Sequence, residues 1–340
     1  MITEVELPGV VEPEGFRLRS TAARPLAAGE ARIRMEATGV SFAEQQMRRG
    51  KYYDQPAFPF VPGYDVVGVL TELGPYTSSP IRVGARVAAL TKVGGWADEL
   101  VVPADELVAV PDGVAADEAE AVIVNGITAH RMMETAKVGP GDTVVVLGAN
   151  GGVASLLVQL ARRRGAEVIG VASQRHLGYV RELGAIPVDR HGDVAAEVRR
   201  IAPDGVAAVF DHVGGEGIKQ SWSYLGRGGI LVSYGTASTR DYEGNGRIPV
   251  LALIGKLLLW NYLPNGKSAL FFNLWAGKRR NPDRFRTQLR DDLGTVFGYL
   301  RDGEISARIA RSFRLSAIAE AVRYAESGAA AGKVIVVPDA

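Results

Sequence analysis

A glycine-rich turn between an apolar run and a helical pattern has the residue types and spacing best suited to binding a ligand. The run Thr143–Leu147 is short and β-branched, as expected of a strand buried on both faces of a parallel sheet. Small residues follow at positions 148, 151 and 154, and apolar residues then recur at helical spacing. A strand–turn–helix of this kind directs backbone N–H groups and the positive end of a helix dipole at one point. We therefore predict a diphosphate site at Gly148, Asn150, Gly151, Gly152 and Val153, the alternative being a glycine turn without a ligand.

The residues after the second strand indicate which dinucleotide would bind. An NAD site usually carries Asp or Glu about 20 residues beyond the turn, where it holds the ribose 2′-hydroxyl. Here the strand 167–172 is followed by Ser173, Arg175 and His176, with no carboxylate. A hydroxyl, a guanidinium and an imidazole suit a 2′-phosphate, so we predict NADP(H). The alternative is that Arg175 and His176 are ordinary solvated residues at a helix start.

Length, composition and charge limit the other classes of function. A chain of 340 residues predicts two domains, and 47% hydrophobic with 23% charged residues is typical of a soluble globular protein. A net charge of +1 gives no electrostatic reason to expect a nucleic acid or an anionic membrane as partner. The absence of cysteine excludes disulfides and thiolate metal sites, which fits a cytoplasmic enzyme. We expect no signal peptide and no membrane span, because the most lipophilic stretch, 248–260, is too short.

The elements that would position these residues change in character along the chain. Residues 1 to about 115 contain short alternating or apolar runs broken by Gly and Pro, which predicts a small β-rich domain. Ser41 to Arg49 is predicted to be a helix, with Ser41 and Glu44 spaced as in a capping box. From about 116 helical and strand patterns alternate, which predicts an α/β fold with a doubly wound parallel sheet. The closing strand 333–337 could rejoin the first domain.

The order of several further motifs resembles the medium-chain dehydrogenase/reductase superfamily, in particular its zinc-free quinone oxidoreductase branch, which includes VAT-1-like proteins. The motifs extend over nearly the whole chain, which makes them more specific than the glycine turn alone. They are Gly39-Val40-Ser41, Arg48 to Tyr52, Pro62 to Gly68, Gly95 to Glu99, Asn125 to Ala129, Gly148 to Ala154, Phe210 to Gly215, Ser233-Tyr234-Gly235 and Gly332-Lys333-Val334.

The resemblance implies a fold, a cofactor and a reaction that composition and periodicity do not show. It implies a GroES-like catalytic domain at 1–115, completed by about 311–340, a Rossmann domain at 116–310, and a cleft between them. It implies reduction of quinones or activated alkenes with NADPH, and a homodimer. It also places further residues at the cofactor, of which Arg190 could hold the 2′-phosphate in a bidentate manner: Asn125, Thr128, Arg190, Val213, Tyr234 and Gly235.

The positions of the metal ligands in zinc-dependent relatives carry other residues here. Ser41 stands in place of a cysteine and Tyr64 in place of a histidine. We therefore expect no metal. The branch often has Asn where Ser41 stands and Asp where Glu44 stands, so the polar part of the substrate pocket is expected to differ.

Tyrosine hydroxyls are the candidate catalytic donors. Hydride transfer requires a donor to the oxygen that gains charge, and a phenol stays protonated at neutral pH. Tyr52 and Tyr64 lie in motifs that line the cleft in the family, so we predict that they act as donors, with packing as the alternative. Ser41 is a third candidate, for which helix capping is the favoured interpretation. Asp65 is expected to brace its loop, and His212 is interpreted as structural.

The apolar stretch Ile248 to Trp275 has no clear counterpart in these motifs. It could form a lid or substrate wall, a subunit interface or plain core. We predict that Tyr53, Phe271 and Phe272 line a pocket for an apolar carbonyl or quinone substrate. The leading hypothesis is a zinc-independent NADPH-dependent reductase of quinones or α,β-unsaturated carbonyls. The alternatives are an NADPH-binding VAT-1-like protein with little turnover that acts by interaction, and a dedicated biosynthetic reductase.

Overall fold

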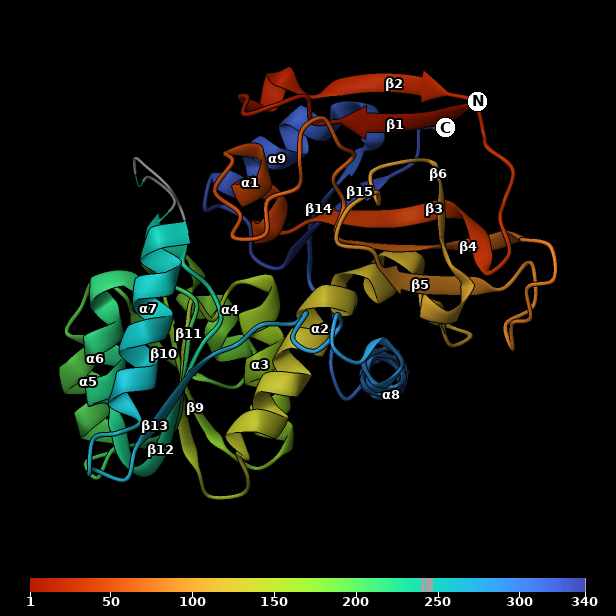
Figure 1. Ribbon diagram of the computed structural model, residues 1–340. Coiled ribbons are helices and arrows are strands. Elements are labelled where there is room, and N and C mark those ends of the chain that lie inside the picture. Colours follow the sequence, from red (N-terminus) through yellow and green to blue (C-terminus); the bar gives the residue numbers. More distant parts are fainter. Residues whose placement is uncertain (240–241, 243–246, 340) are drawn as a thin grey trace. The chain divides into compact units, whose positions relative to one another are not determined.

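The computed structural model describes residues 1–239, 242 and 247–339. The chain divides into two compact units, coloured along the sequence in Figure 1. Unit 1 comprises Met1–Ile127 and Gly277–Ala340, and unit 2 comprises Thr128–Ala276. Within the described residues, no helix is both long and apolar enough to cross a bilayer.

Unit 1 is built on a largely antiparallel sheet whose centre is the long strand β3. This strand pairs with β4, β6 and β15, and the sheet runs in the order β14-β15-β3-β4-β5-β7. Register shifts in β3 opposite β4 bend the ladder, as β-bulges do. A separate ribbon is formed by the first two strands. The strands are β1 (Ile2–Glu6), β2 (Arg17–Thr21), β3 (Glu30–Val40), β4 (Asp65–Leu73), β5 (Arg86–Leu90), β6 (Glu99–Pro103), β7 (Val108–Ala109), β14 (Ile309–Arg314) and β15 (Lys333–Val337).

The helices of unit 1 cover this sheet and complete its core. Ile318, Ala321 and Val322 of α9 are buried in the same apolar cluster as Trp96 and Phe313. The elements are η1 (Pro13–Gly15), α1 (Phe42–Arg48), η2 (Ala104–Glu106), the first part of α2 (Ala116–Ala136), α8 (Pro282–Arg301), η6 (Leu315–Ala317) and α9 (Ile318–Glu326).

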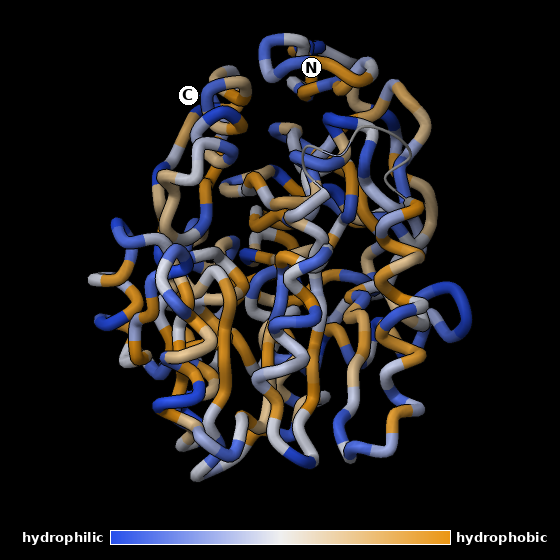
Figure 2. Tube along the Cα trace, turned by 90° about the vertical axis from the view of Figure 1, so that its left-hand side faces the viewer, coloured by the Kyte–Doolittle hydropathy of each residue, from blue (hydrophilic) through white to orange (hydrophobic). Residues whose placement is uncertain are grey.

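Unit 2 contains a six-stranded sheet in which every pair of neighbours is parallel, in the order β10-β9-β8-β11-β12-β13. Its central strands are nearly continuous apolar runs, which form long orange stretches of the trace in Figure 2, because helices cover both faces of such a sheet. The strands are β8 (Thr143–Leu147), β9 (Glu167–Ala172), β10 (Ile186–Asp189), β11 (Val206–Asp211), β12 (Leu225–Ser233) and β13 (Ser268–Phe271).

The helices of unit 2 alternate with these strands. Val194 and Val198 of α5 pack into the sheet core, and the Asp193 side chain caps this helix by accepting from the N–H of Ala196 at 2.9 Å. The elements are α3 (Gly152–Arg163), η3 (Gln174–His176), α4 (Leu177–Glu182), α5 (Val194–Ile201), η4 (Gly215–Gly217), α6 (Ile218–Ser223), η5 (Ala237–Thr239) and α7 (Arg247–Trp260).

The α/β class, the parallel sheet and the return of the last strand to the first unit were all expected, but the units change at other residues than the predicted domains. The sequence suggests changes near 115 and 311, whereas the compact units change at 127/128 and 276/277. The second shift arises because α8 contacts other elements of unit 1, where Arg286 Nη1 of α8 lies 3.4 Å from Asp105 Oδ2. The strand β14, parallel to β15, and the strand β13 were not anticipated.

Candidate functional site

The glycine turn of unit 2 has the backbone conformation that the sequence predicts for a nucleotide loop. Gly148 follows β8 with φ of +62°, and the N–H of Gly151 returns to its carbonyl at 2.8 Å. A Cβ at position 148 would overlap the imidazole of His212. Position 148 is therefore restricted to glycine by its positive φ and by the His212 side chain, which follows β11.

The turn leads directly into α3, whose first residues are Gly152 and Val153. Gly151 is the N-cap residue, and among the described residues no side chain caps the helix. Its first N–H groups therefore remain available to an acceptor, which fits a diphosphate group. Asn150 lies in the turn and is half-buried. The diphosphate site is consistent with this backbone, although its residue roles remain predictions.

The turn lies where the order of the parallel sheet reverses. Strand β8 is flanked by β9 on one side and by β11 on the other. From β8 the chain continues to β9 and β10 on one side, and then crosses to β11, β12 and β13 on the other. Ligands of open α/β sheets bind outside the carboxyl ends of strands at such a switch point. His212 directly follows β11 and reaches Gly148, so it lies at this position rather than in a remote part of the fold.

The carboxyl ends of β11 and β12 bring together the other predicted cofactor residues of unit 2. Asp211 Oδ1 accepts from the N–H of Val213 at 2.7 Å and of Gly214 at 2.9 Å, and its Oδ2 accepts from the Ser221 hydroxyl at 2.6 Å. The carbonyl of Asp211 accepts from Tyr234 N–H at 2.9 Å. Gly235 is pressed against the His212 backbone, where a Cβ would approach the carbonyl oxygen to 2.6 Å. Buried Asp211 thus fixes the loop that carries Val213.

The predicted 2′-phosphate residues collect at the ends of β9 and β10. The N–H of Arg190 donates to the carbonyl of Ala172 at 2.8 Å, which places Arg190 beside Ser173. Arg175 and Arg190 are exposed, whereas His176 is buried. A carboxylate, Asp189, lies at the same strand end, and its Oδ1 accepts from the N–H of His191 at 3.0 Å.

Two predicted cofactor residues lie on α2. Asn125 Nδ2 donates to the carbonyl of Ala121 at 3.1 Å within the helix, and the side chain is buried. Thr128 is also buried. Asn125 belongs to unit 1 and Thr128 to unit 2.

The predicted catalytic tyrosines of unit 1 contact each other. The hydroxyls of Tyr52 and Tyr64 are 2.8 Å apart, and the Tyr52 ring lies against Tyr53 with 4.7 Å between centroids. Burial, followed by the neighbouring Tyr64 and Tyr53, raises the pKa of Tyr52. The Tyr52 phenol therefore stays protonated at neutral pH and can donate.

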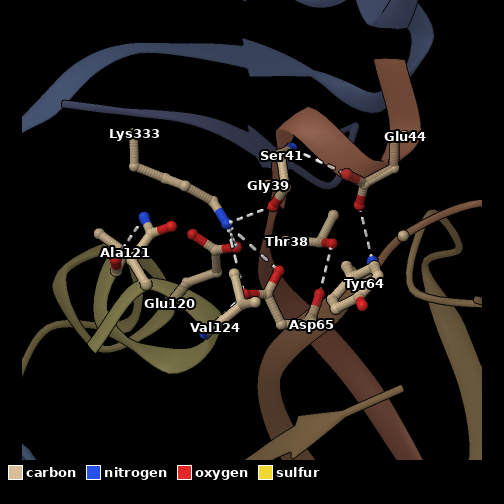
Figure 3. A network of polar contacts seen from close by, with 12 residues as sticks. Thr38, Gly39, Ser41, Glu44, Tyr64, Asp65, Glu120, Ala121, Val124 and Lys333 are labelled. Atoms are coloured by element: carbon tan, nitrogen blue, oxygen red, sulfur yellow. Dashed lines mark hydrogen bonds and ion pairs between the residues drawn. The ribbon is translucent and has the colours of Figure 1, made fainter. Parts of the chain in front are cut away.

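Glu44 connects the tyrosine pair to Ser41. Its Oε1 accepts from the N–H of Tyr64 at 2.8 Å, and its Oε2 accepts from the N–H of Ser41 at 2.9 Å (Figure 3). The second bond is half of the capping box at the start of α1, which confirms the predicted cap. Burial raises the pKa of Glu44 to about 7, opposed by the nearby Lys333 and assisted by Asp65. The three predicted catalytic residues therefore share one network.

A buried lysine forms the centre of this network, as Figure 3 shows. Lys333 Nζ lies 3.1 Å from Ser41 Oγ, 3.3 Å from Asp65 Oδ2 and 3.2 Å from Glu120 Oε1. Burial would lower the pKa of Lys333, but the carboxyl groups of Asp65, Glu120 and Glu44 outweigh it and raise the pKa. The lysine is therefore an ammonium ion.

The two carboxyl groups beside this lysine differ in their surroundings. Asp65 Oδ2 also accepts from the N–H of Val124 at 3.1 Å, so the expected bracing role of Asp65 extends to α2. Burial, and then the charge of Asp65, raises the pKa of Glu120 well above its usual value, although Lys333 acts in the opposite direction. Gly39 passes beside them, and a Cβ there would overlap both Lys333 and Glu120.

The apolar stretch after 247 contributes to the core of unit 2. Leu253 and Leu257 of α7 are buried there, and Phe271 packs against the same cluster from β13. The N–H of Phe272 donates to the carbonyl of Ser233 at 2.7 Å. The core interpretation thus holds for one side of α7, while the predicted pocket roles of Tyr53, Phe271 and Phe272 remain untested.

Glu120 was not anticipated from the sequence, and Lys333 and Asp211 lie in two of the quoted motifs without a predicted role. Lys333 and Glu120 are separated from Asp65 by 268 and 55 positions, so no local spacing relates them. Lys333 stands at the start of the apolar strand KVIVV, where a charged residue that becomes buried is expected to be paired. His212 was noticed but interpreted as structural.

Two family models match the chain, and together they define its class. The alcohol dehydrogenase GroES-like domain matches residues 27–112, and the zinc-binding dehydrogenase domain matches residues 183–336. The chain belongs to the medium-chain dehydrogenase/reductase superfamily of oxidoreductases.

Individual relatives give the same class. The human synaptic vesicle membrane protein VAT-1 homolog is 34% identical over 228 residues, which are 65% of this chain and 58% of the human protein. The chain therefore spans little more than half of that relative. A 2-haloacrylate reductase from a Burkholderia species is 28% identical over 329 residues, which are 92% of each protein.

A solved structure confirms the fold over the whole chain. A mycobacterial protein complexed with NADPH superimposes with a TM-score of 0.85 at 25% identity, covering 99% of this chain and 100% of its own. The GroES-like fold of unit 1 and the Rossmann fold of unit 2 are thus both shown.

Proposed function

We propose that this chain is a zinc-independent reductase that uses NADP(H) to reduce quinones or the carbon–carbon double bond of α,β-unsaturated carbonyl compounds. The observation that carries the proposal is the turn at Gly148, which lies at the switch point of a parallel sheet and leads into a helix start that no described side chain caps. The mycobacterial neighbour, which is a complex with NADPH, supports the cofactor, and the 2-haloacrylate reductase supports an activated alkene as acceptor.

The cofactor preference rests on the charge at the adenosine end. Arg175 and Arg190 supply guanidinium groups near Ser173, at the place where an NAD site would have a carboxylate. When bound, the reduced nicotinamide supplies a hydride. Arginines that bind the 2′-phosphate lie at the adenosine end and do not take part in hydride transfer. They should therefore change the affinity for NADPH and not the rate of the chemical step.

The reaction requires a donor for the oxygen of the acceptor. A hydride that adds to the β-carbon moves the double-bond electrons toward the carbonyl, so charge develops on its oxygen. The linked hydroxyls of Tyr52 and Tyr64 can donate to that oxygen. The proton that the α-carbon takes up afterwards can pass from the phenol, which recovers it from water. The reaction then balances: one hydride and one proton are added.

Zinc independence is supported by the chemistry around Ser41. Zinc prefers nitrogen and sulfur ligands, whereas hydroxyl groups occupy the two corresponding positions here, Ser41 and Tyr64. The Lys333 ammonium, 3.1 Å from Ser41 Oγ, would also repel a second cation. We expect turnover to persist after dialysis against a chelator, with metal content below one zinc per ten chains by elemental analysis. Loss of activity that added zinc restores would contradict this part.

The activity is tested with the purified chain and a panel of acceptors. NADPH and NADH affinities are measured by calorimetry, and NADPH oxidation is followed by absorbance with menadione, benzoquinone and cyclohexenone. We expect tighter binding of NADPH and turnover with at least one acceptor. Tight NADPH binding with no oxidation by any acceptor would instead favour the alternative, a binding protein that acts by interaction. This alternative is considered because the chain is 34% identical to the human VAT-1 homolog, which is named as a synaptic vesicle membrane protein.

A further inference from the structure

Ser41 is the accessible end of an otherwise buried charge centre. The side chains of Lys333, Asp65 and Glu120 are between 0 and 3% exposed, and Glu44 is also buried. Ser41 is half-buried and touches this centre through its hydroxyl. Of these residues, Ser41 is therefore the one that an approaching molecule can reach.

The direction of the bond between Lys333 and Ser41 follows from chemistry. An ammonium group donates up to three hydrogen bonds and accepts none. Three groups that can accept surround Nζ within 3.4 Å: Ser41 Oγ, the Asp65 carboxylate and Glu120 Oε1. Ser41 Oγ must therefore accept from Lys333. Among the described residues, no group accepts the hydroxyl hydrogen of Ser41, which leaves this hydrogen for another acceptor.

The charge behind Ser41 makes its hydroxyl a stronger donor. A hydroxyl oxygen that accepts from an ammonium is polarised, and hydrogen bonds in a chain strengthen each other, most of all away from water. Asp65 and Glu120 surround the ammonium group and hold it in place. The capping box directs Ser41 as well, because Glu44 holds the N–H of both Ser41 and Tyr64. Glu44 thus links the backbones of Ser41 and Tyr64, while the Ser41 hydroxyl contacts Lys333 and the Tyr64 hydroxyl contacts that of Tyr52.

We propose that Ser41 is a catalytic hydrogen-bond donor to the acceptor oxygen that gains charge during hydride transfer, and that Lys333 is the positioning residue that polarises it. Ser41 keeps its proton throughout, so the reaction still adds one hydride and one proton to the acceptor. The proposal rests on the proposed reductase function and adds Ser41 to Tyr52 and Tyr64 as a donor to the developing oxyanion. It assigns the capping serine a second role.

The test is a double-mutant cycle on Ser41 and Lys333. We expect S41A to lower kcat by about 10²-fold, the usual effect of removing one oxyanion donor, without a change in the Kd for NADPH. K333M should lower kcat to a similar extent, and the double variant should be no worse than the poorer single variant. S41T, which retains a hydroxyl, should recover most of the activity. Acceptors, kinetics and calorimetry are those used for the wild-type chain.

Matched controls separate catalysis from structure. S316A removes another hydroxyl group at the start of a helix in unit 1. In the wild-type chain this hydroxyl donates to Asp339 Oδ1 at 2.5 Å. K278M removes another lysine paired with a carboxylate, Glu106. Both should retain wild-type kcat. If K333M fails to fold, as shown by thermal unfolding, the comparison of S41A with S41T still decides the proposal.

Each outcome has a defined meaning. Wild-type kcat in S41A, or losses that multiply in the double variant, would overturn the role of the Ser41–Lys333 pair while the reductase function stands. Absence of turnover by the wild-type chain with every acceptor would overturn the reductase function, and this proposal with it.

Discussion

Glu44 joins two of the predicted active-site residues through its two carboxylate oxygens, although it is fully buried. It accepts backbone N–H groups from Ser41 and Tyr64, which favours the ionised form, while burial favours the neutral one. Burial dominates and raises the pKa of Glu44 to about 7, from an ordinary value of 4.5. At this residue, the arrangement of the site therefore reduces the stability of the fold at neutral pH.

Replacing Glu44 should make stability less dependent on pH. A carboxyl whose pKa is raised on folding stabilises fully below its unfolded pKa, and this contribution is lost as pH rises through the folded value, here between about 4.5 and 7. The loss is on the order of 3 kcal/mol at most. We expect E44Q to weaken the fall in unfolding free energy between pH 5 and pH 8, measured by urea denaturation. An unchanged slope would show that Glu44 does not titrate in this range.

A methyl group at Gly148 should disable the nucleotide turn. Alanine there would have a φ of +62° and would overlap the His212 ring. We expect G148A to weaken NADPH binding at least tenfold in calorimetry. Gly139 precedes the same strand with open space around it, so G139A is the matched control and should bind normally. Normal NADPH affinity in G148A would argue against a diphosphate at this turn.

At the scale of elements, the carboxyl ends of parallel strands gather residues that are distant in sequence. The end of β9 supplies Ser173 and Arg175, and the end of β10 supplies Arg190, which is hydrogen-bonded to Ala172. Parallel strands in one sheet all present their carboxyl ends to the same edge, so this grouping is a property of the sheet. The cations of two loops can then act on one phosphate.

Removing these cations should change the preference for NADPH over NADH. We expect R175A/R190A to weaken NADPH binding by about tenfold or more, since a charge-assisted bond contributes roughly 1.5–3 kcal/mol. NADH affinity should stay within twofold. R200A, on the exposed face of α5 beside Glu197, is the control and should leave both affinities unchanged. Equal affinities for the two cofactors in the wild-type chain would contradict the assignment to a 2′-phosphate.

At the scale of the molecule, unit 2 has a face that resembles an interface. Strand β13 ends the parallel sheet, with β12 as its partner among the described strands. On α7, Leu251, Leu258 and Leu259 are exposed, while Leu253 and Leu257 enter the core. Free strand edges and exposed apolar stripes are features that monomers tend to avoid. The homodimer that the family resemblance implies stays a prediction, and we expect its interface on this face.

Charges on this face should dissociate a dimer. We expect the wild-type chain to sediment as a dimer and L258E/L259E to sediment as a folded monomer, because burying two carboxylates opposes association. L18E places a glutamate at an exposed leucine of unit 1 and should leave the association state unchanged. A wild-type chain that sediments as a monomer at micromolar concentration would contradict the expectation.

The sequence alone predicts the elements whose signals are local. The strand–turn–helix at Gly148, the capping box of Ser41 with Glu44, the helix at 194–201 and the strand at 333–337 follow from periodicity, glycine placement and capping residues within a few positions. The parallel sheet follows from the alternation of such elements. The superfamily followed from the order of motifs, and the family models confirm it.

The tertiary structure decided what depends on contacts between distant segments. It placed α8 in unit 1, where Arg286 pairs with Asp105, and added β14 to the sheet beside β15, with which it pairs in parallel. It also brought Lys333 and Glu120 to Asp65 and Ser41. Sequence spacing does not predict this cluster. A buried ammonium group is stable only where the fold places oppositely charged groups beside it, and here those groups come from segments that are distant in the sequence.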